Sequence, residues 1–65
     1  MNKIYVAHYS MGYDYGDLNV FTSLDKAKKS ADASLETYNF VDVYEYTLIN
    51  DEYVESKEPV YEAER

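Results

Sequence analysis

The chain contains no cysteine and no tryptophan, and it has only one proline and two glycines among its 65 residues. Without cysteine it has neither a disulfide framework nor a thiolate metal site, which is typical of a reducing compartment. No stretch approaches the roughly 18 apolar residues that a membrane-spanning helix needs. The start, MNKIYVAHYS, also lacks the apolar region of a signal peptide. These absences predict a soluble, cytoplasmic protein with no membrane partner.

Basic residues are scarce as well, since six lysines and arginines stand against thirteen acidic residues and give a net charge of −7. Nucleic acids and anionic membranes attract positive charge, so this balance predicts no direct nucleic-acid binding and favours a basic protein as partner. Residues 39–65 hold eight of the acids and two of the bases. This acidic half either has a specific electrostatic role or only keeps a small protein soluble, and both interpretations stay open.

The length predicts a single domain over residues 1–65. Three segments rich in β-branched and aromatic residues predict strands at 3–9, 18–22 and 40–49, and a shorter strand begins at Glu52. Asn50 and Asp51 suit a two-residue hairpin turn between the last two strands. Because Pro59 cannot donate a backbone hydrogen bond, residues 59–65 are expected to form an edge extension or a loose tail.

One helix is expected over about residues 23–38. Thr22, with Asp25 three residues later, resembles a capping box and marks the helix start. Apolar residues then recur at spacings of three and four, which is the stripe of a helix that packs on a sheet. The stripe comprises Leu24, Ala27, Ala31, Leu35 and Tyr38.

The element order predicts an α+β fold, a two-layer ββαββ domain whose four-stranded antiparallel sheet has the order 2-1-3-4 and carries one helix on one face. Strand alternation divides the side chains between two faces. The face beneath the helix is expected to hold Ile4, Val6, Val20, Val41 and Val43. The opposite face is expected to hold Tyr5, Ala7, Tyr9, Phe21, Tyr44, Tyr46 and Leu48. The reversed arrangement, with the aromatic residues beneath the helix, stays open because both sets are apolar.

No residue pattern predicts catalysis, a cofactor or a metal. His8 lies within a predicted strand and has no neighbouring carboxylate or nucleophile in sequence, so a structural role is favoured. Asp14, Asp17 and the run from Asn50 to Glu52 lack the loop pattern of a calcium site and are better explained as turn residues. We therefore expect a protein that is not an enzyme.

Nine tyrosines are the strongest compositional signal. Tyrosine combines a large apolar ring with a polar hydroxyl, which suits a surface that binds a partner, although tyrosine is also a good strand former on a solvated sheet. The expected partner-binding residues combine this aromatic face, the loop after the first strand and the acidic last hairpin. They are Tyr5, Tyr9, Tyr13, Tyr15, Tyr44, Tyr46, Asp51, Glu52, Tyr53 and Glu55.

The segment KIYVAHYS, followed by a loop and VFTSLDKAKKSA, resembles a pattern in short, uncharacterised phage and bacterial proteins over roughly residues 3–31. In composition the chain is also similar to small acidic phage proteins that inhibit host or defence enzymes. The pattern implies a small stand-alone domain of unknown function, and the similarity in composition implies a phage-encoded inhibitor in the host cytoplasm. An acidic surface of this kind could mimic nucleic acid and fill a basic groove. The alternative is a structural homo-oligomer, such as a homodimer, that associates through its tyrosine-rich sheet face.

Overall fold

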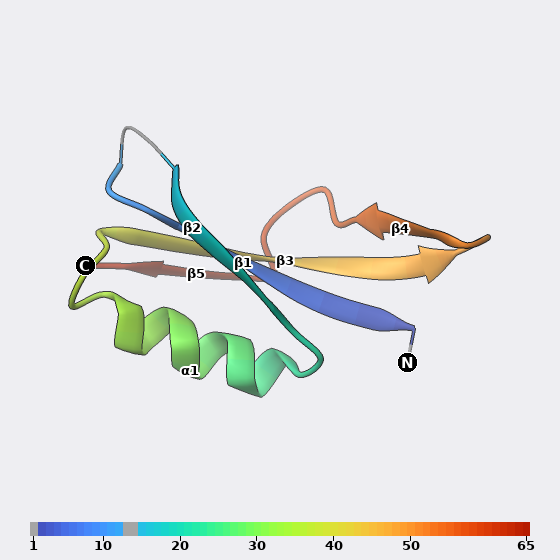
Figure 1. Ribbon diagram of the computed structural model, residues 1–65, viewed down its shortest axis with the longest axis horizontal. Coiled ribbons are helices and arrows are strands. Elements are labelled where there is room, and N and C mark those ends of the chain that lie inside the picture. The colour runs from blue at the N-terminus through green and yellow to red at the C-terminus, as the bar shows by residue number, and fades with distance from the viewer. Residues whose placement is uncertain (1, 13–14) are drawn as a thin grey trace.

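The computed structural model describes residues 2–12 and 15–65, except for the side chain of Tyr15. The described residues form one helix and five strands in an antiparallel sheet (Figure 1). The α+β fold predicted from the sequence is confirmed. The elements are β1 (Lys3–Ser10), β2 (Tyr15–Phe21), α1 (Leu24–Ser34), β3 (Phe40–Ile49), β4 (Glu52–Glu55) and β5 (Tyr61–Glu64).

The sheet has the predicted order β2-β1-β3-β4, and β5 is added to it. Both β4 and β5 pair with β3, β4 along Tyr46–Ile49 and β5 along Phe40–Val43, so they share one edge of the sheet. Of the two alternatives for residues 59–65, the edge extension is therefore the observed one. Tyr61 and Ala63 alternate with two glutamates, and this period of two is the sequence signal for β5.

The helix is shorter than predicted, and its cap is Ser23 instead of Thr22. The Ser23 side chain accepts a hydrogen bond from the backbone N–H of Lys26, at 3.4 Å, and thereby satisfies one of the free amides of the first turn. Regular helix ends at Ser34, and the turn that follows brings Leu35 and Tyr38 back against the core. This helix, at 11 residues, is too short and too polar to cross a membrane.

The predicted turn at Asn50 and Asp51 is confirmed, since both residues have positive φ angles, of 51° and 66°. Two consecutive left-handed residues define the type I′ turn, whose twist matches that of the flanking strands. Asn and Asp tolerate this conformation better than most residues. The turn aligns β4 so that Leu48 lies opposite Tyr53 and Thr47 opposite Val54.

The side chains of β1 and β2 lie on the faces opposite to those first assigned to them. Register pairs Ala7 with Val43 and Tyr9 with Val41, and directly paired residues of an antiparallel sheet share a face. Tyr5, Ala7, Tyr9 and Phe21 therefore lie on the helix side with Val41 and Val43, whereas Ile4, Val6 and Val20 share the other face with Tyr44, Tyr46 and Leu48. The predicted grouping is right for β3 and wrong for β1 and β2.

The core between α1 and the sheet is built from small side chains. Ala27 and Ala31 of the helix are fully buried against Ala7, Val41 and Val43, which are fully buried as well. Alanine on both layers lets the helix backbone approach the sheet closely, and it leaves no space for larger residues. Larger residues close the margin of this core, namely Tyr5, Phe21, Leu24, Leu35, Tyr38 and Tyr61.

The tight packing predicts that enlarging Ala31 destabilises the protein. The substitution Ala31→Leu forces extra methyl groups into a filled space and should lower the free energy of unfolding by about 1–3 kcal/mol. This is a large part of the roughly 3–10 kcal/mol expected for a chain of this length. Ala33→Leu, at an exposed position of the same helix, is the matched control and should change stability little. Urea denaturation measures both, and equal effects would contradict the packing described here.

Candidate interaction surface

Five tyrosines are tied to other side chains by their hydroxyl groups. Tyr38 donates to Asp17 at 2.5 Å, Tyr61 to Asp32 at 2.6 Å and Tyr46 to Glu55 at 2.5 Å. Tyr5 reaches Glu45 at 3.4 Å, and Tyr9 shares a hydrogen bond of 2.8 Å with Ser30. Except for Tyr5 and Tyr46, these bonds connect a strand with α1 or with the turn after it. Much of the tyrosine content therefore holds the two layers together.

The carboxylate partners change the acidity of three of these phenols. The hydrogen bond to Glu55 is the main cause that raises the pKa of Tyr46 to about 12 from its usual value of 10. The hydrogen bonds to Asp17 and Asp32 likewise raise the pKa of Tyr38 and of Tyr61. An ionised phenol beside a carboxylate loses the hydrogen bond and gains repulsion, so the protonated form is favoured.

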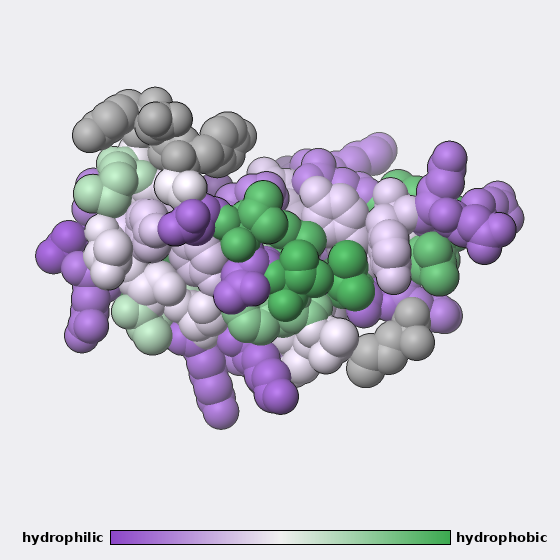
Figure 2. Space-filling view, in the orientation of Figure 1, coloured by the Kyte–Doolittle hydropathy of each residue, from purple (hydrophilic) through white to green (hydrophobic). Residues whose placement is uncertain are grey.

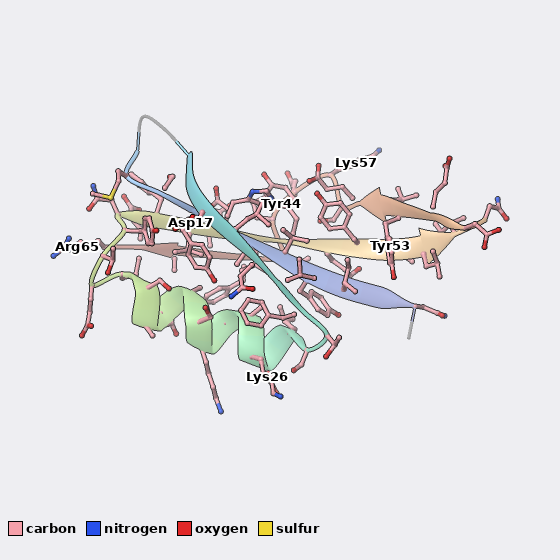
Figure 3. The ribbon with its side chains drawn as sticks, viewed as in Figure 1. Asp17, Lys26, Tyr44, Tyr53, Lys57 and Arg65 are labelled. Carbon is pink, nitrogen blue, oxygen red and sulfur yellow. The ribbon has the colours of Figure 1, made fainter. Side chains whose placement is uncertain are left out.

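The sheet face turned away from α1, here called the open face, is not covered by any described helix or strand (Figure 1). Its side chains alternate with those that pack under the helix. Tyr44 lies on this side of the sheet in Figure 3. The open face consists of Ile4, Val6, His8, Leu18, Val20, Phe40, Asp42, Tyr44, Tyr46, Leu48, Tyr53, Glu55, Glu62 and Glu64.

Apolar residues gather on the β2 and β1 side of the open face. Leu18 and Val20 are 61% and 51% exposed, which makes them the two most exposed large apolar residues of the described chain. Figure 2 shows apolar surface at the centre of the molecule, where β2 passes in front of the sheet in Figure 1. Val6 is buried between its cross-strand neighbours Val20 and Tyr44. The surface is thus a continuous apolar one and not a set of isolated side chains.

Carboxylates gather on the opposite side of the open face. Asp42 on β3 lies directly opposite Glu62 on β5, and Glu64 follows two residues later on the same face. Like charges in directly opposed positions destabilise a sheet. The strands contain one lysine or arginine, Lys3, which lies on the helix side and pairs with Glu45 at 3.5 Å. The strands therefore contribute carboxylates, but no lysine or arginine, to the open face.

His8 lies between the apolar and the acidic sides of the open face. Its ring stands edge-on to Tyr44, with centroids 5.8 Å apart and an angle of 84°. Together with Asp42 and Glu55, these two residues line a concave region of about 200 Å³. Within the described ranges, no group of three or more histidine, cysteine or acidic side chains could hold a metal ion.

The hairpin of β3 and β4 extends beyond the end of α1 and forms an arm (Figures 1 and 3). Within the described chain, α1 contacts β1, β2, β3 and β5 but not β4. Leu48 and Tyr53 are exposed on one face of the arm, and Ile49 and Val54 on the other. A hairpin with apolar side chains exposed on both faces has little packing of its own.

The predicted binding residues do not form one site. Tyr44, Tyr46, Tyr53 and Glu55 lie on the open face, and Asp51 and Glu52 lie exposed at the tip of the arm. Tyr5 and Tyr9 do not join them, because both pack on the helix side, where Tyr9 is buried. Tyr13 and the side chain of Tyr15 lie outside the described residues.

Sequence reasoning did not select Leu18, Val20, Phe40 or Asp42 as binding residues. Alternation within β2 and β5 was available as a signal. Assigning it to a face required the register between strands, however, and this register depends on tertiary packing.

No family model matches this chain, and neither a curated protein nor a solved structure shows significant similarity to it. The resemblance to short phage and bacterial proteins therefore stays a prediction.

The raised pKa of Tyr46 predicts a loss of stability at high pH. Because its pKa is higher in the folded chain than the usual value of 10, the contribution is complete below pH 10 and is lost as the pH rises through about 12. Glu55→Ala should return the pKa of Tyr46 toward 10, as followed by the absorbance of the phenolate. Tyr46→Phe identifies the signal, and Glu52→Ala is the control. An unchanged titration in Glu55→Ala would contradict the assignment.

Proposed function

We propose that this protein is a non-enzymatic module that binds a basic protein through its open face. The observation that carries the proposal is the composition of that face, where an exposed apolar side adjoins an acidic side that has no lysine or arginine in its strands. Apolar surface supplies binding free energy when it leaves water, and the carboxylates select a partner of opposite charge.

The arm supports the same proposal. Ile49 and Val54 on one of its faces and Leu48 and Tyr53 on the other are between 39% and 49% exposed. A partner that covers the arm would bury these side chains and supply the packing that α1 does not give. Asp51 and Glu52 place further negative charge at its tip. Exposed apolar surface with an acidic border is typical of a docking site.

The pair of Asp42 and Glu62 adds an electrostatic argument. Register places the two carboxylates directly opposite each other on the open face, where a lysine or arginine of a partner could bind between them.

Among basic partners, we favour a host protein with a groove for nucleic acid. Carboxylates on β3, β4 and β5 would take the positions of phosphates, and the tyrosine rings of Tyr44 and Tyr46 would supply flat apolar contacts beside them. The protein would then act as an inhibitor by competition, in keeping with the phage-protein resemblance. Such an inhibitor should be displaced by nucleic acid.

Neutralising the acidic side of the open face should weaken the complex. Immobilised protein captures partners from its host cells in low salt, and the affinity of the captured protein is then measured for each variant. Glu62→Gln with Glu64→Gln removes two exposed carboxylates and should weaken binding roughly 2- to 30-fold, at about 0.2–1 kcal/mol for each exposed pair. The effect should shrink at high salt, because exposed charges are screened.

The matched control is Asp25→Asn with Glu36→Gln, which removes the same charge from exposed positions in the region of α1. This control should bind with nearly wild-type affinity, since those side chains lie away from the open face. Equal weakening by both double variants would show that only net charge matters and would overturn the proposed site. Binding that is unaffected by an excess of nucleic acid would contradict the inhibitor mechanism and leave the binding site standing.

A further inference from the structure

The two edges of the sheet differ sharply in how they are protected. The β4 and β5 edge is interrupted by the loop 56–60, which contains Lys57 and Pro59, and it carries Glu55, Glu62 and Glu64. Interruption, proline and charge are the usual devices that prevent an edge from pairing with another chain. The edge formed by β2, with the sequence YGDLNVF, contains neither lysine nor proline. Its one irregularity is a register shift opposite Tyr9 and Ser10, which leaves the pairing of residues 17–21 with β1 regular.

The direction of the backbone groups of β2 follows from the hydrogen bonds of its neighbour. The carbonyl of Asn2 accepts from Leu48 at 2.7 Å, so the even-numbered residues of β1 bond to β3 and the odd-numbered ones bond to β2. Since Ala7 pairs with Asn19, the odd-numbered residues of β2 bond inward. Leu18 and Val20 therefore direct their N–H and C=O groups outward, away from the sheet.

The hydrogen bond of Val20 agrees with this direction. Its N–H donates to the side-chain oxygen of Asn19 at 3.0 Å, a local and exposed bond that a strand partner can replace. The only acid of β2, Asp17, accepts the hydroxyl of Tyr38 and lies on the helix side. The outer edge of β2 is thus apolar, nearly free of unpaired charge and supplied with outward backbone groups.

We propose that β2 is a self-association edge, at which two copies of this chain pair antiparallel, with Leu18 of each copy opposite Val20 of the other. Such pairing forms about four backbone hydrogen bonds between the copies. It also brings together the two most exposed large apolar side chains of each copy. Charge favours this edge over the other, because pairing through β4 and β5 would bring glutamates of both copies together.

The pairing has a defined consequence for the open face. Antiparallel strands are related by a two-fold axis perpendicular to the sheet, so both helices lie on one side and both open faces on the other. The apolar sides of the two open faces then meet at the centre, and the acidic sides form the two outer borders. Because the interface is small, the dimer is expected to be in equilibrium with its monomer. This inference shares Leu18 and Val20 with the proposed function, but it rests on the outward backbone groups of β2, so the dimer can fail without the binding of a basic partner failing.

Sedimentation equilibrium over a range of protein concentrations tests the dimer. The wild-type protein should approach the dimer mass at high concentration. Val20→Pro removes an outward N–H without removing a bond to β1 and should stay monomeric, and so should Leu18→Lys, which adds charge at the edge. Leu48→Lys adds the same charge to the open face at the arm and should still dimerise. If Val20→Pro fails to fold, as judged by circular dichroism, Leu18→Lys decides alone.

Amide hydrogen exchange gives an internal control within one strand. The inward N–H of Asn19 should be protected at every concentration, whereas the N–H groups of Leu18 and Val20 should become protected only as the dimer forms. A wild-type monomer at all concentrations would overturn the proposal. So would loss of the dimer in Leu48→Lys with retention in Leu18→Lys, which would assign self-association to the open face.

Discussion

Close contact between small side chains on both layers is the constraint on which the rest of this structure depends. Ala27 and Ala31 leave the helix backbone near the sheet, where they pack with Ala7, Val41, Val43 and Ala63, and Tyr9 is the one large side chain of this buried cluster. A core of this kind buries little apolar area per residue, and apolar burial is the main source of stability. The protein must therefore find further stabilisation at the margin of the core.

Tyrosine supplies that stabilisation, because its ring closes the margin while its hydroxyl reaches an acceptor at the surface. Tyr38 and Tyr61 at the margin bond to Asp17 and Asp32, and the buried Tyr9 bonds to Ser30. All three bonds join a strand to α1 or to the turn that follows it. One short helix still covers only part of one face. The open face and the arm stay outside this packing, and for that reason they are the surfaces available for recognition.

Most of the architecture could be predicted from the sequence, because it depends on local patterns: strand alternation, the helical stripe and the Asn50 and Asp51 turn. The face on which each β1 side chain lies could not be predicted. Tyr5 and Tyr9 suit either the interior or the surface, and Ile4 and Val6 are also apolar enough to pack beneath the helix. In the structure Ala7 and Tyr9 are the β1 residues that pack with Ala27 and Ala31 in the buried core. The acidic side of the open face needed β5, whose pairing with β3 is a tertiary contact.

The central claim is that α1 covers the face of Ala7 and leaves the face of Leu18 and Val20 in solvent. Methyl NMR with a soluble paramagnetic probe, on protein dilute enough to be monomeric, tests it most directly. We expect strong relaxation of the Leu18 and Val20 methyl groups and of exposed Ala33, with Ala7, Ala27, Ala31, Val41 and Val43 protected. Strong relaxation of Ala7 together with protection of Leu18 and Val20 would place the helix on the other face and contradict it.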